Sequence, residues 1–255
     1  MKQIKHGSVC IHFLDFLLRF ANEKGLDAKA LILMARLDPH VFEDQDSRMP
    51  AVTFMKVWNH IADYCEDPHF GLHLGSHLTH FPFSHIVFSV MLNDRNLLSA
   101  LKNMIRYHNL MSDLISPRLF VDDKTVVFSI EKQDDDIPEK RQYSEFIFAM
   151  VLTFLRYLNA GKTDPQIVRF SHGKPDDFSE QTNFFKSKIV FGDKKDEMVL
   201  QKSLLESKIN LANPDISMVD IAFLLGFSEQ SAFIHAFKIW TGQTPNGYRV
   251  SVAKQ

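Results

Sequence analysis

The feature that most constrains the fold is a run of ten almost purely apolar residues, FIFAMVLTFL, at positions 146–155. The run is about half as long as the roughly 20 residues that a membrane-spanning helix needs. Together with its flanks, over residues 143–159, it instead indicates a helix buried in the core of a folded domain. The chain has 255 residues, and one domain takes about 150. We therefore expect two folded units.

Amphipathic helices are predicted on the N-terminal side of this segment. Apolar residues recur with the helical period over residues 9–23, a pattern that ends at Gly25. The same period returns in four further segments, at 28–36, 50–64, 70–78 and 96–114. Pro50 stands where a helix can begin. The first part of the chain is therefore expected to be helical.

The period changes over residues 118–130. The sequences RLFV and TVVFSI are separated by Asp122, Asp123 and Lys124, which is typical of two strands joined by a turn. Further strands are expected at 166–170 and 188–191, on either side of a helix at 179–185. The predicted fold class is α+β and mostly helical, with a mixed helix/strand domain at 1–205 and a short all-α module at 206–255.

The C-terminal module has the pattern of a helix-turn-helix. Ser217 and Asp220 form a capping box before a short helix that ends at Gly226. A second helix follows, with Ser228 as its N-cap and Gly242 at its end. The second helix of such a motif can enter the major groove of DNA. Four aromatic residues are expected in the core of the module: Phe227, Phe233, Phe237 and Trp240.

The run AFLLGFSEQSAFIHAFKIWTGQTPNGYR at 222–249 closely resembles the C-terminal signature of AraC/XylS-type bacterial transcription regulators, in which A-x-x-x-G-F, F-x-x-x-F-K, G-x-T-P and Y-R recur in this order. GLDAKALILMARLDP, GLHLGSHL and IVRFSHGKPDDFSEQTNFFKSKIVFGDKKDEMVLQKSLL are similar to the arabinose-binding-type N-terminal domain of one branch of that family. The resemblance covers nearly the whole chain. It implies an effector-sensing and dimerisation domain at 1–205 and a DNA-binding domain at 206–255.

The resemblance also assigns DNA-binding residues to the second helix. Gln230, Ser231 and His235 take the groove-facing positions, and Lys238 lies near phosphates together with the helix N-terminus at Ser228. The spacing of Ser231, His235 and Lys238 by four and three agrees, because it puts them on one face, opposite the aromatic residues. Glutamine can pair with adenine through two hydrogen bonds. The alternative is that these are ordinary solvated polar residues.

One feature departs from the family pattern. Family members carry two helix-turn-helix units joined by a long helix, whereas only the 11 residues at 206–216 separate the sensor domain from Ser217. A mean helix alone takes roughly 11 or 12 residues, so the first unit is expected to be missing. Residues 201–255 also have a net charge of only +1, with five Lys or Arg against four Asp or Glu. DNA binding is therefore expected to be weak and sensitive to salt.

Two other classes of function are considered. A chain with one reading helix could bind ligand or dimerise without binding DNA alone, and act by pairing with a full-length relative. Four histidines, His69, His73, His77 and His80, could share a helix face as metal ligands, although solvated or hydrogen-bonded histidines are the simpler interpretation. No phosphate-loop, dinucleotide-binding, zinc-protease or nucleophile-elbow motif is present. We expect no enzyme activity, cofactor or metal.

Composition indicates the partners and the compartment. With 29 Lys and Arg against 31 Asp and Glu, the net charge is −2, so any nucleic-acid binding must be local. Cys10 and Cys65 are too few for a disulfide framework and no export signal is recognisable, which favours the cytoplasm. The 23 Phe residues favour an apolar or amphipathic effector, whose binding residues the sequence does not indicate. The expected partners are promoter DNA, this effector, a second copy in a homodimer and RNA polymerase, but no membrane.

Overall fold

The computed structural model describes residues 7–44, 46–77, 87, 91, 94–132, 140–159, 161–207, 209, 222 and 229–252. The N-terminal part consists of α1 (Ile11–Glu23), α2 (Ala28–Met34), the 3-10 helix η1 (Pro39–Phe42), α3 (Ala51–Cys65) and α4 (Phe70–Ser76), with a small sheet of β1 (Ser8–Cys10) and β2 (Arg48–Pro50). The middle part consists of α6 (Leu97–Tyr107), η2 (His108–Leu110), β3 (Ile115–Val121), β4 (Thr125–Lys132), α7 (Lys140–Leu158), β5 (Ile167–Phe170), α8 (Ser179–Phe185), β6 (Lys188–Phe191), β7 (Asp196–Gln201) and α9 (Lys202–Leu205). The C-terminal part consists of α11 (Gln230–Thr241) and α12 (Pro245–Val252). The fold class is α+β and mostly helical, as predicted.

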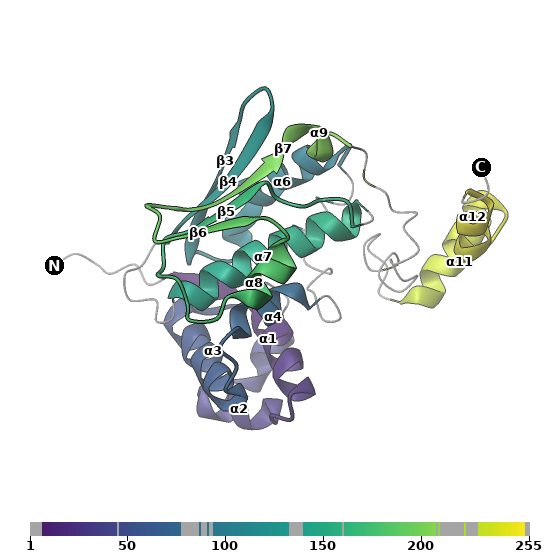
Figure 1. Ribbon diagram of the computed structural model, residues 1–255. Helices are drawn as coiled ribbons and strands as arrows, with labels where there is room; N and C mark the ends of the chain where they lie inside the picture. The colour runs from purple at the N-terminus through teal and green to yellow at the C-terminus, as the bar shows by residue number, and fades with distance from the viewer. Residues whose placement is uncertain are drawn as a thin grey trace.

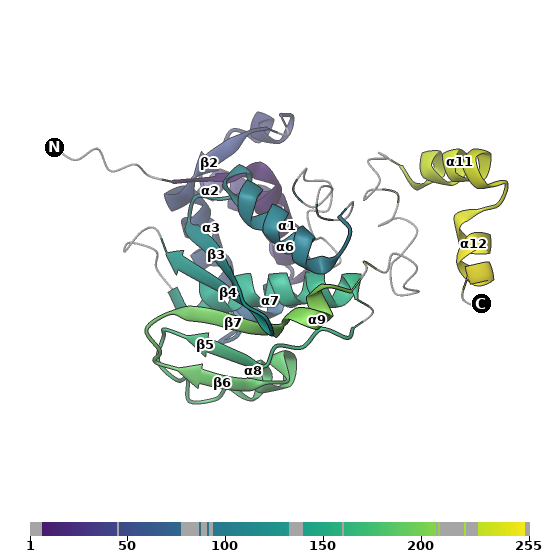
Figure 2. The same cartoon turned by 90° about the horizontal axis from the view of Figure 1, so that it is seen from above.

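Five strands form one sheet in the order β3-β4-β7-β5-β6, visible side by side in Figure 2. The β5–β6 pair is parallel and the other pairs are antiparallel. The predicted β3–β4 hairpin is confirmed, and Asp122 stabilises its turn by accepting hydrogen bonds from the backbone N–H groups of Lys124 (2.8 Å) and Thr125 (2.6 Å). The central strand β7 was not predicted.

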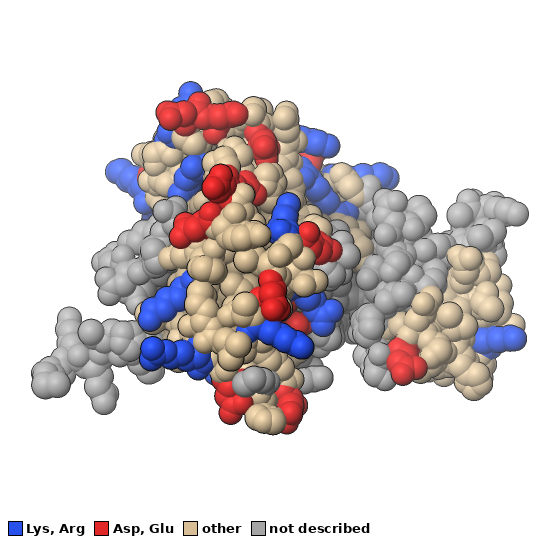
Figure 3. Space-filling view, turned by 90° about the horizontal axis from the view of Figure 1, so that it is seen from below, with Lys and Arg blue, Asp and Glu red and all other residues tan. Residues whose placement is uncertain are grey.

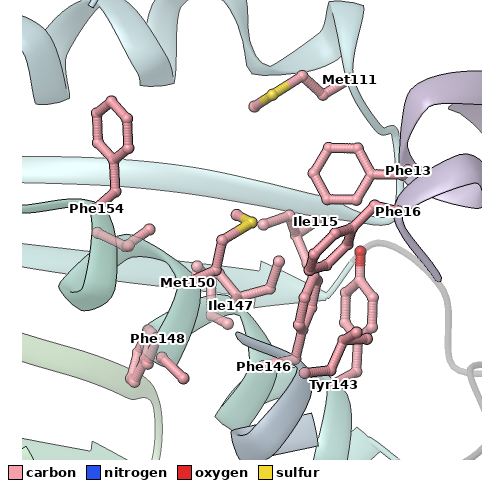
Figure 4. Packing of buried hydrophobic residues seen from close by; sticks show 14 of the residues in the cluster. Phe13, Phe16, Met111, Ile115, Tyr143, Phe146, Ile147, Phe148, Met150 and Phe154 are labelled. Carbon is pink, nitrogen blue, oxygen red and sulfur yellow. The ribbon is translucent and has the colours of Figure 1, made fainter. Parts of the chain in front are cut away.

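Helix α7 is the centre of the core, as the apolar run predicted. Figure 1 shows it between the sheet and helices α1 to α4. On one side Phe146 lies 5.2 Å, between ring centroids, from Trp58 of α3. On the other side Phe148 lies 5.8 Å from Phe128 of β4 and 5.5 Å from Phe170 of β5. These rings are buried, so α7 joins the two layers through aromatic packing (Figure 4).

Two glycines let α4 approach α7 closely. A Cβ on Gly71 would lie 1.8 Å from the carbonyl oxygen of Gln142 on α7. A Cβ on Gly75 would lie 2.5 Å from the carbonyl oxygen of Phe146. Because both neighbours are backbone atoms that cannot move aside, any side chain at these positions would push the two helices apart.

Several predicted boundaries shift because of contacts between distant segments. The helix expected at 96–114 ends as α6 at Tyr107 and continues as η2 to Leu110. Beyond it Asp113 accepts hydrogen bonds from the backbone N–H (3.1 Å) and side-chain hydroxyl (2.9 Å) of Ser8. This tertiary pairing draws the segment out of the helix. Residues 8–10 form a strand because they pair with β2, so α1 begins at Ile11 rather than at position 9.

Within the described ranges, no helix is both long and apolar enough to cross a lipid bilayer. Cys10 and Cys65 are free thiols. Burial raises the pKa of both, so neither is an activated thiolate.

Candidate nucleic-acid interface and effector cavity

Helix α11 is the second helix of the predicted helix-turn-helix. Its N-cap is Glu229, whereas Ser228 was predicted, and no side chain caps the helix. The Ser231 hydroxyl donates to the Glu229 carboxylate at 3.1 Å, so Glu229 is held at the start of the helix. The helix ends as predicted at Gly242, whose φ of 77° is left-handed. Ser228 and the first predicted helix, apart from Ala222, lie outside the described residues.

Three of the residues predicted to bind DNA share an exposed face of α11. Ser231, His235 and Lys238 are exposed, and Gln230 is partly exposed. Phe233, on the opposite face, has only 1% of its surface exposed. The structure therefore places Ser231, His235 and Lys238 on one open side of the helix, whereas Gln230 lies about 100° around the helix from Ser231, on the side of Phe237.

The predicted core of this module is only partly correct. Phe233 is buried and Phe237 is half-buried, its ring 5.6 Å from that of Tyr248 on α12. Trp240 was expected in the core but is 66% exposed. The reason is its place in the last turn of α11, where Thr241 and Gly242 are also at the surface. Phe227 lies outside the described residues.

The charge of this unit is low. Between residues 229 and 248 the charged side chains are Glu229 and Lys238, and Figure 3 shows the unit as mostly uncharged surface. Elsewhere on the molecule, the face in Figure 3 has positive and negative side chains interspersed. Among residues 229–248, Lys238 is therefore the cation that can pair with a DNA phosphate.

The histidines considered as metal ligands are instead paired with carboxylates and an amide. His73 contacts Asp67 through Nδ1 at 2.6 Å and Glu180 through Nε2. His77 Nε2 lies 2.7 Å from Glu23 Oε2. His69 Nδ1 is hydrogen-bonded to the Gln181 amide at 3.0 Å. Among the residues with described positions, no three His, Cys, Asp or Glu are grouped to hold a metal ion; His80 is not among them.

These pairings affect protonation. Burial acts to lower the pKa of His73, but the hydrogen bonds and charges of Asp67 and Glu180 outweigh it, so the pKa is raised above 6.5. Burial lowers the pKa of His172, which lies 3.5 Å from the fully buried carboxylate of Glu145. The histidines therefore form ion pairs and hydrogen bonds that join α4, α7 and α8.

A small cavity of about 30 Å³ lies between α1, α6, β3, β4 and α7. All its lining residues except the half-buried His108 are buried. Figure 4 shows several of them, with Phe13 and Met111 facing Ile147 and Met150 of α7. The lining consists of Phe13, Met104, His108, Met111, Ser112, Ile115, Pro117, Phe128, Tyr143, Ile147, Met150 and Val151.

A second cavity of about 10 Å³ adjoins the first, and the two share Met104, Met150 and Val151. Its other lining residues, which are all apolar, are Met91, Leu101, Phe154 and Leu155. Proteins hold small ligands in pockets of about 300–1,000 Å³ lined mainly by apolar side chains, and these two cavities have such a lining but a much smaller volume. The sequence did not reveal this site, because its residues come from segments far apart in the chain.

Two models of protein families match the chain. A family model described as the arabinose-binding domain of AraC transcription regulators, N-terminal, matches residues 25–209, more than half of the chain. A model described as a helix-turn-helix domain matches residues 187–251. No curated protein matches the chain.

Among solved structures, the transcriptional regulator CdpR from Pseudomonas aeruginosa is similar to this chain, with a TM-score of 0.52. The match covers 92% of this chain and 98% of that chain at 17% sequence identity, which shows a shared fold. The assignment to a family rests on the two family models. This chain belongs to the AraC family and is a transcription regulator that combines an effector-binding N-terminal domain with a DNA-binding helix-turn-helix.

Proposed function

We propose that residues 206–255 bind promoter DNA through the exposed face of α11, and that residues 1–205 bind the effector. Gln230, Ser231 and His235 contact base edges in the major groove, and Lys238 contacts a phosphate. Ser228, which precedes the helix, contributes to the phosphate-facing N-terminus. The observation that carries this proposal is the exposure of Ser231, His235 and Lys238 on one side of α11, opposite the buried Phe233.

We further propose that the regulator acts as a homodimer in the cytoplasm. One helix with one described cation would bind DNA weakly, whereas a symmetric pair presents two reading helices to two half-sites. An effector that prefers one arrangement of the sensor domain would shift the helices between placements that fit DNA and placements that do not. Contact with RNA polymerase is proposed from the family's role in transcription alone.

The other functions considered have no observation in their favour. The match of a helix-turn-helix model to residues 187–251 favours DNA binding over a partner that does not bind DNA alone. A metal-dependent enzyme built on the histidines is not favoured either, because His69, His73 and His77 are hydrogen-bonded or ion-paired to protein groups.

The test is sequence-specific binding by the full chain. Promoter fragments upstream of the protein's own gene and its neighbours would be measured by fluorescence anisotropy, with and without excess unrelated DNA. The variants Ser231→Ala and His235→Ala should each lose discrimination worth about 1–3 kcal/mol at one base position. Asn22→Ala, at an exposed position on α1, is the matched control and should bind like the wild type. Unchanged specificity in both α11 variants would contradict the assignment of these residues.

A further inference from the structure

We propose that β3 is the dimerisation surface, and that its outer edge pairs in an antiparallel arrangement with β3 of a second copy of the chain. The inference rests on the proposed homodimer and deepens it by naming the surface through which two subunits associate. Three features of the strand support it: unpaired backbone groups along its edge, exposed apolar side chains beside them, and charges that match across a two-fold axis.

The direction of the backbone groups of β3 follows from its pairing with β4. β3 forms one edge of the five-stranded sheet. At the turn, the backbone N–H of Asp122 donates to the carbonyl oxygen of Thr125 at 3.1 Å. In an antiparallel pair, residues that bond to the neighbouring strand alternate with residues whose N–H and C=O groups point away from it. Phe120 is therefore turned toward β4, whereas Leu119 and Val121 direct their N–H and C=O groups outward.

These outward groups of Leu119 and Val121 have no hydrogen-bond partner within the described part of the chain. The next outward positions are less open: Pro117 has no N–H group, and the carbonyl oxygen of Ile115 is 3.1 Å from a ring nitrogen of His108. Figure 1 shows the β3–β4 hairpin projecting beyond the rest of the sheet, so its end is accessible. An edge with unpaired backbone groups is a template for a further strand.

The side chains at this end of the strand are also open to solvent. Phe120 and Val121 are 53% and 42% exposed. Soluble proteins usually protect a sheet edge with charged residues, proline or a covering element. Exposed apolar side chains beside unpaired backbone groups instead favour the addition of a strand, because it would remove apolar surface from water and pair the backbone at the same time.

A second copy fits this edge with a two-fold axis at Phe120. Identical strands related by such an axis are antiparallel, and the contact is the same from both sides. Leu119 would then exchange both backbone hydrogen bonds with Val121 of the partner subunit, so the axis repeats the exchange and all the outward groups of both residues are paired. The two Phe120 rings would lie opposite each other, and cross-strand aromatic pairs stabilise sheets.

The charges match in the same register. Arg118 would lie directly opposite Asp122 of the partner subunit, and the axis makes this pair twice. The Arg118 side chain is 55% exposed and contacts Glu131 at 2.9 Å, so it lies at the surface of the strand. Hydrogen bonds from Thr125 lower the pKa of Asp122, which keeps its carboxylate ionised. Opposite charges that face each other across two strands stabilise their pairing.

Other registers fit less well. An axis at Arg118 would place two arginines opposite each other, which destabilises a strand pair. An axis at Leu119 would bring Asp123 of the partner subunit against Ile115, where His108 already covers the edge. The match of the strand to itself favours a second copy over an unrelated extended peptide.

The pairing would involve residues 118–122 of each subunit and is therefore small. Stable dimers bury about 1,200–2,000 Å² in total, and two hairpin ends bury less. The dimer should therefore dissociate on dilution, and the binding of two subunits to neighbouring half-sites of DNA should strengthen it.

The experiment is sedimentation of the full chain over a series of concentrations. Phe120→Lys removes the aromatic pair and sets two lysines opposite each other, so it should raise the dissociation constant of the dimer about tenfold or more. Leu33→Lys is the control, because Leu33 is 73% exposed and lies on α2, at the other end of the domain from the hairpin (Figure 1). Should Phe120→Lys not fold, Val121→Lys makes the same test.

The outcomes separate this surface from the proposed homodimer. A dimer that Phe120→Lys leaves intact would overturn the surface and leave the homodimer standing. A wild-type chain that stays monomeric at all concentrations, with and without DNA, would overturn both. Loss of the dimer in Leu33→Lys to the same extent would also contradict the assignment to β3.

Cysteine cross-linking tests the register. With the axis at Phe120, the two Cα atoms of Phe120→Cys lie about 4.5 Å apart, within the range of a disulfide, so mild oxidation should give a covalent dimer on a non-reducing gel. The two Cα atoms of Leu119→Cys would lie at least about 7–8 Å apart and should cross-link poorly. Leu33→Cys measures cross-linking by random collision. Cross-linking of Phe120→Cys no faster than that of Leu33→Cys, or slower than that of Leu119→Cys, would overturn the proposed pairing.

Discussion

Helix α7 and helix α11 are both rich in apolar residues, but they are packed in opposite ways. From Tyr143 to Leu155 every residue of α7 is buried. In α11 Phe233 is the buried residue, while Ile239 and Trp240 are 70% and 66% exposed. Apolar sequence therefore does not by itself determine burial; the number of covering layers does. A helix with neighbours on several sides supports the domain, whereas a helix covered on one side can present the other to a ligand as large as DNA.

The largest difference should appear when one aromatic ring is removed from each helix. Phe146→Ala deletes a ring packed against Phe13, Phe16, Trp58 and Tyr143, and should lower the free energy of unfolding by about 3–5 kcal/mol. Trp240→Ala should cost less than about 1 kcal/mol, because most of the ring already faces solvent. Urea unfolding followed by far-UV circular dichroism measures both. Equal losses of unfolding free energy in the two variants would contradict the difference in packing between α7 and α11.

The close approach of α4 to α7 offers a second way to test the comparison. Gly71→Ala places a Cβ against the backbone of Gln142 and should cost about 3 kcal/mol of unfolding free energy through overpacking. Gly173→Ala is the control, since a Cβ there meets no atom within 4 Å. Thermal melting of the two variants distinguishes them. A Gly71→Ala protein as stable as the wild type would show that the helices are not held at this distance.

Smaller effects should come from His73, which joins α4 to α8 through its contacts with Asp67 and Glu180. Because its pKa is raised in the folded protein, its contribution to stability is complete below 6.5, the value of an unperturbed histidine, and is lost as the pH rises through the folded-state pKa. His73→Gln should therefore lower the melting temperature more at about pH 5.5 than at about pH 8. A larger fall in melting temperature at the higher pH would contradict the raised pKa of His73 in the folded protein.

The parts of the fold that the sequence predicted are those set by local pattern. The apolar run predicted α7, and Asp122 with its neighbours predicted the β3–β4 turn. Strand β7 was missed because Asp196 and Glu197 open it, and because its partners are distant: Met198 pairs with both Phe128 and Val168. Strand β1 was missed for the same reason, since its partner β2 lies about 40 residues away.

In the candidate site, too, the sequence predicted what depends on local spacing and missed what depends on contacts between distant segments. The face of α11 followed from the spacing of Ser231, His235 and Lys238, because one helix presents all three. The cavity did not follow from any motif, since Phe13, Ile115 and Tyr143 meet only when three elements pack together. The expectation of an apolar effector came from the abundance of Phe, and it stays a prediction until a ligand is bound.

The measurement that tests the central claim most directly is DNA binding of the full chain across a salt series, by fluorescence anisotropy, with Lys238→Ala and with Lys162→Ala as an exposed control on the N-terminal domain. If α11 is the reading helix, binding should be saturable and weaken with salt. Lys238→Ala should then reduce the slope of log affinity against log salt by about one unit per subunit, and Lys162→Ala should leave it unchanged. Absence of binding at low salt, or equal slopes for all three proteins, would contradict the account.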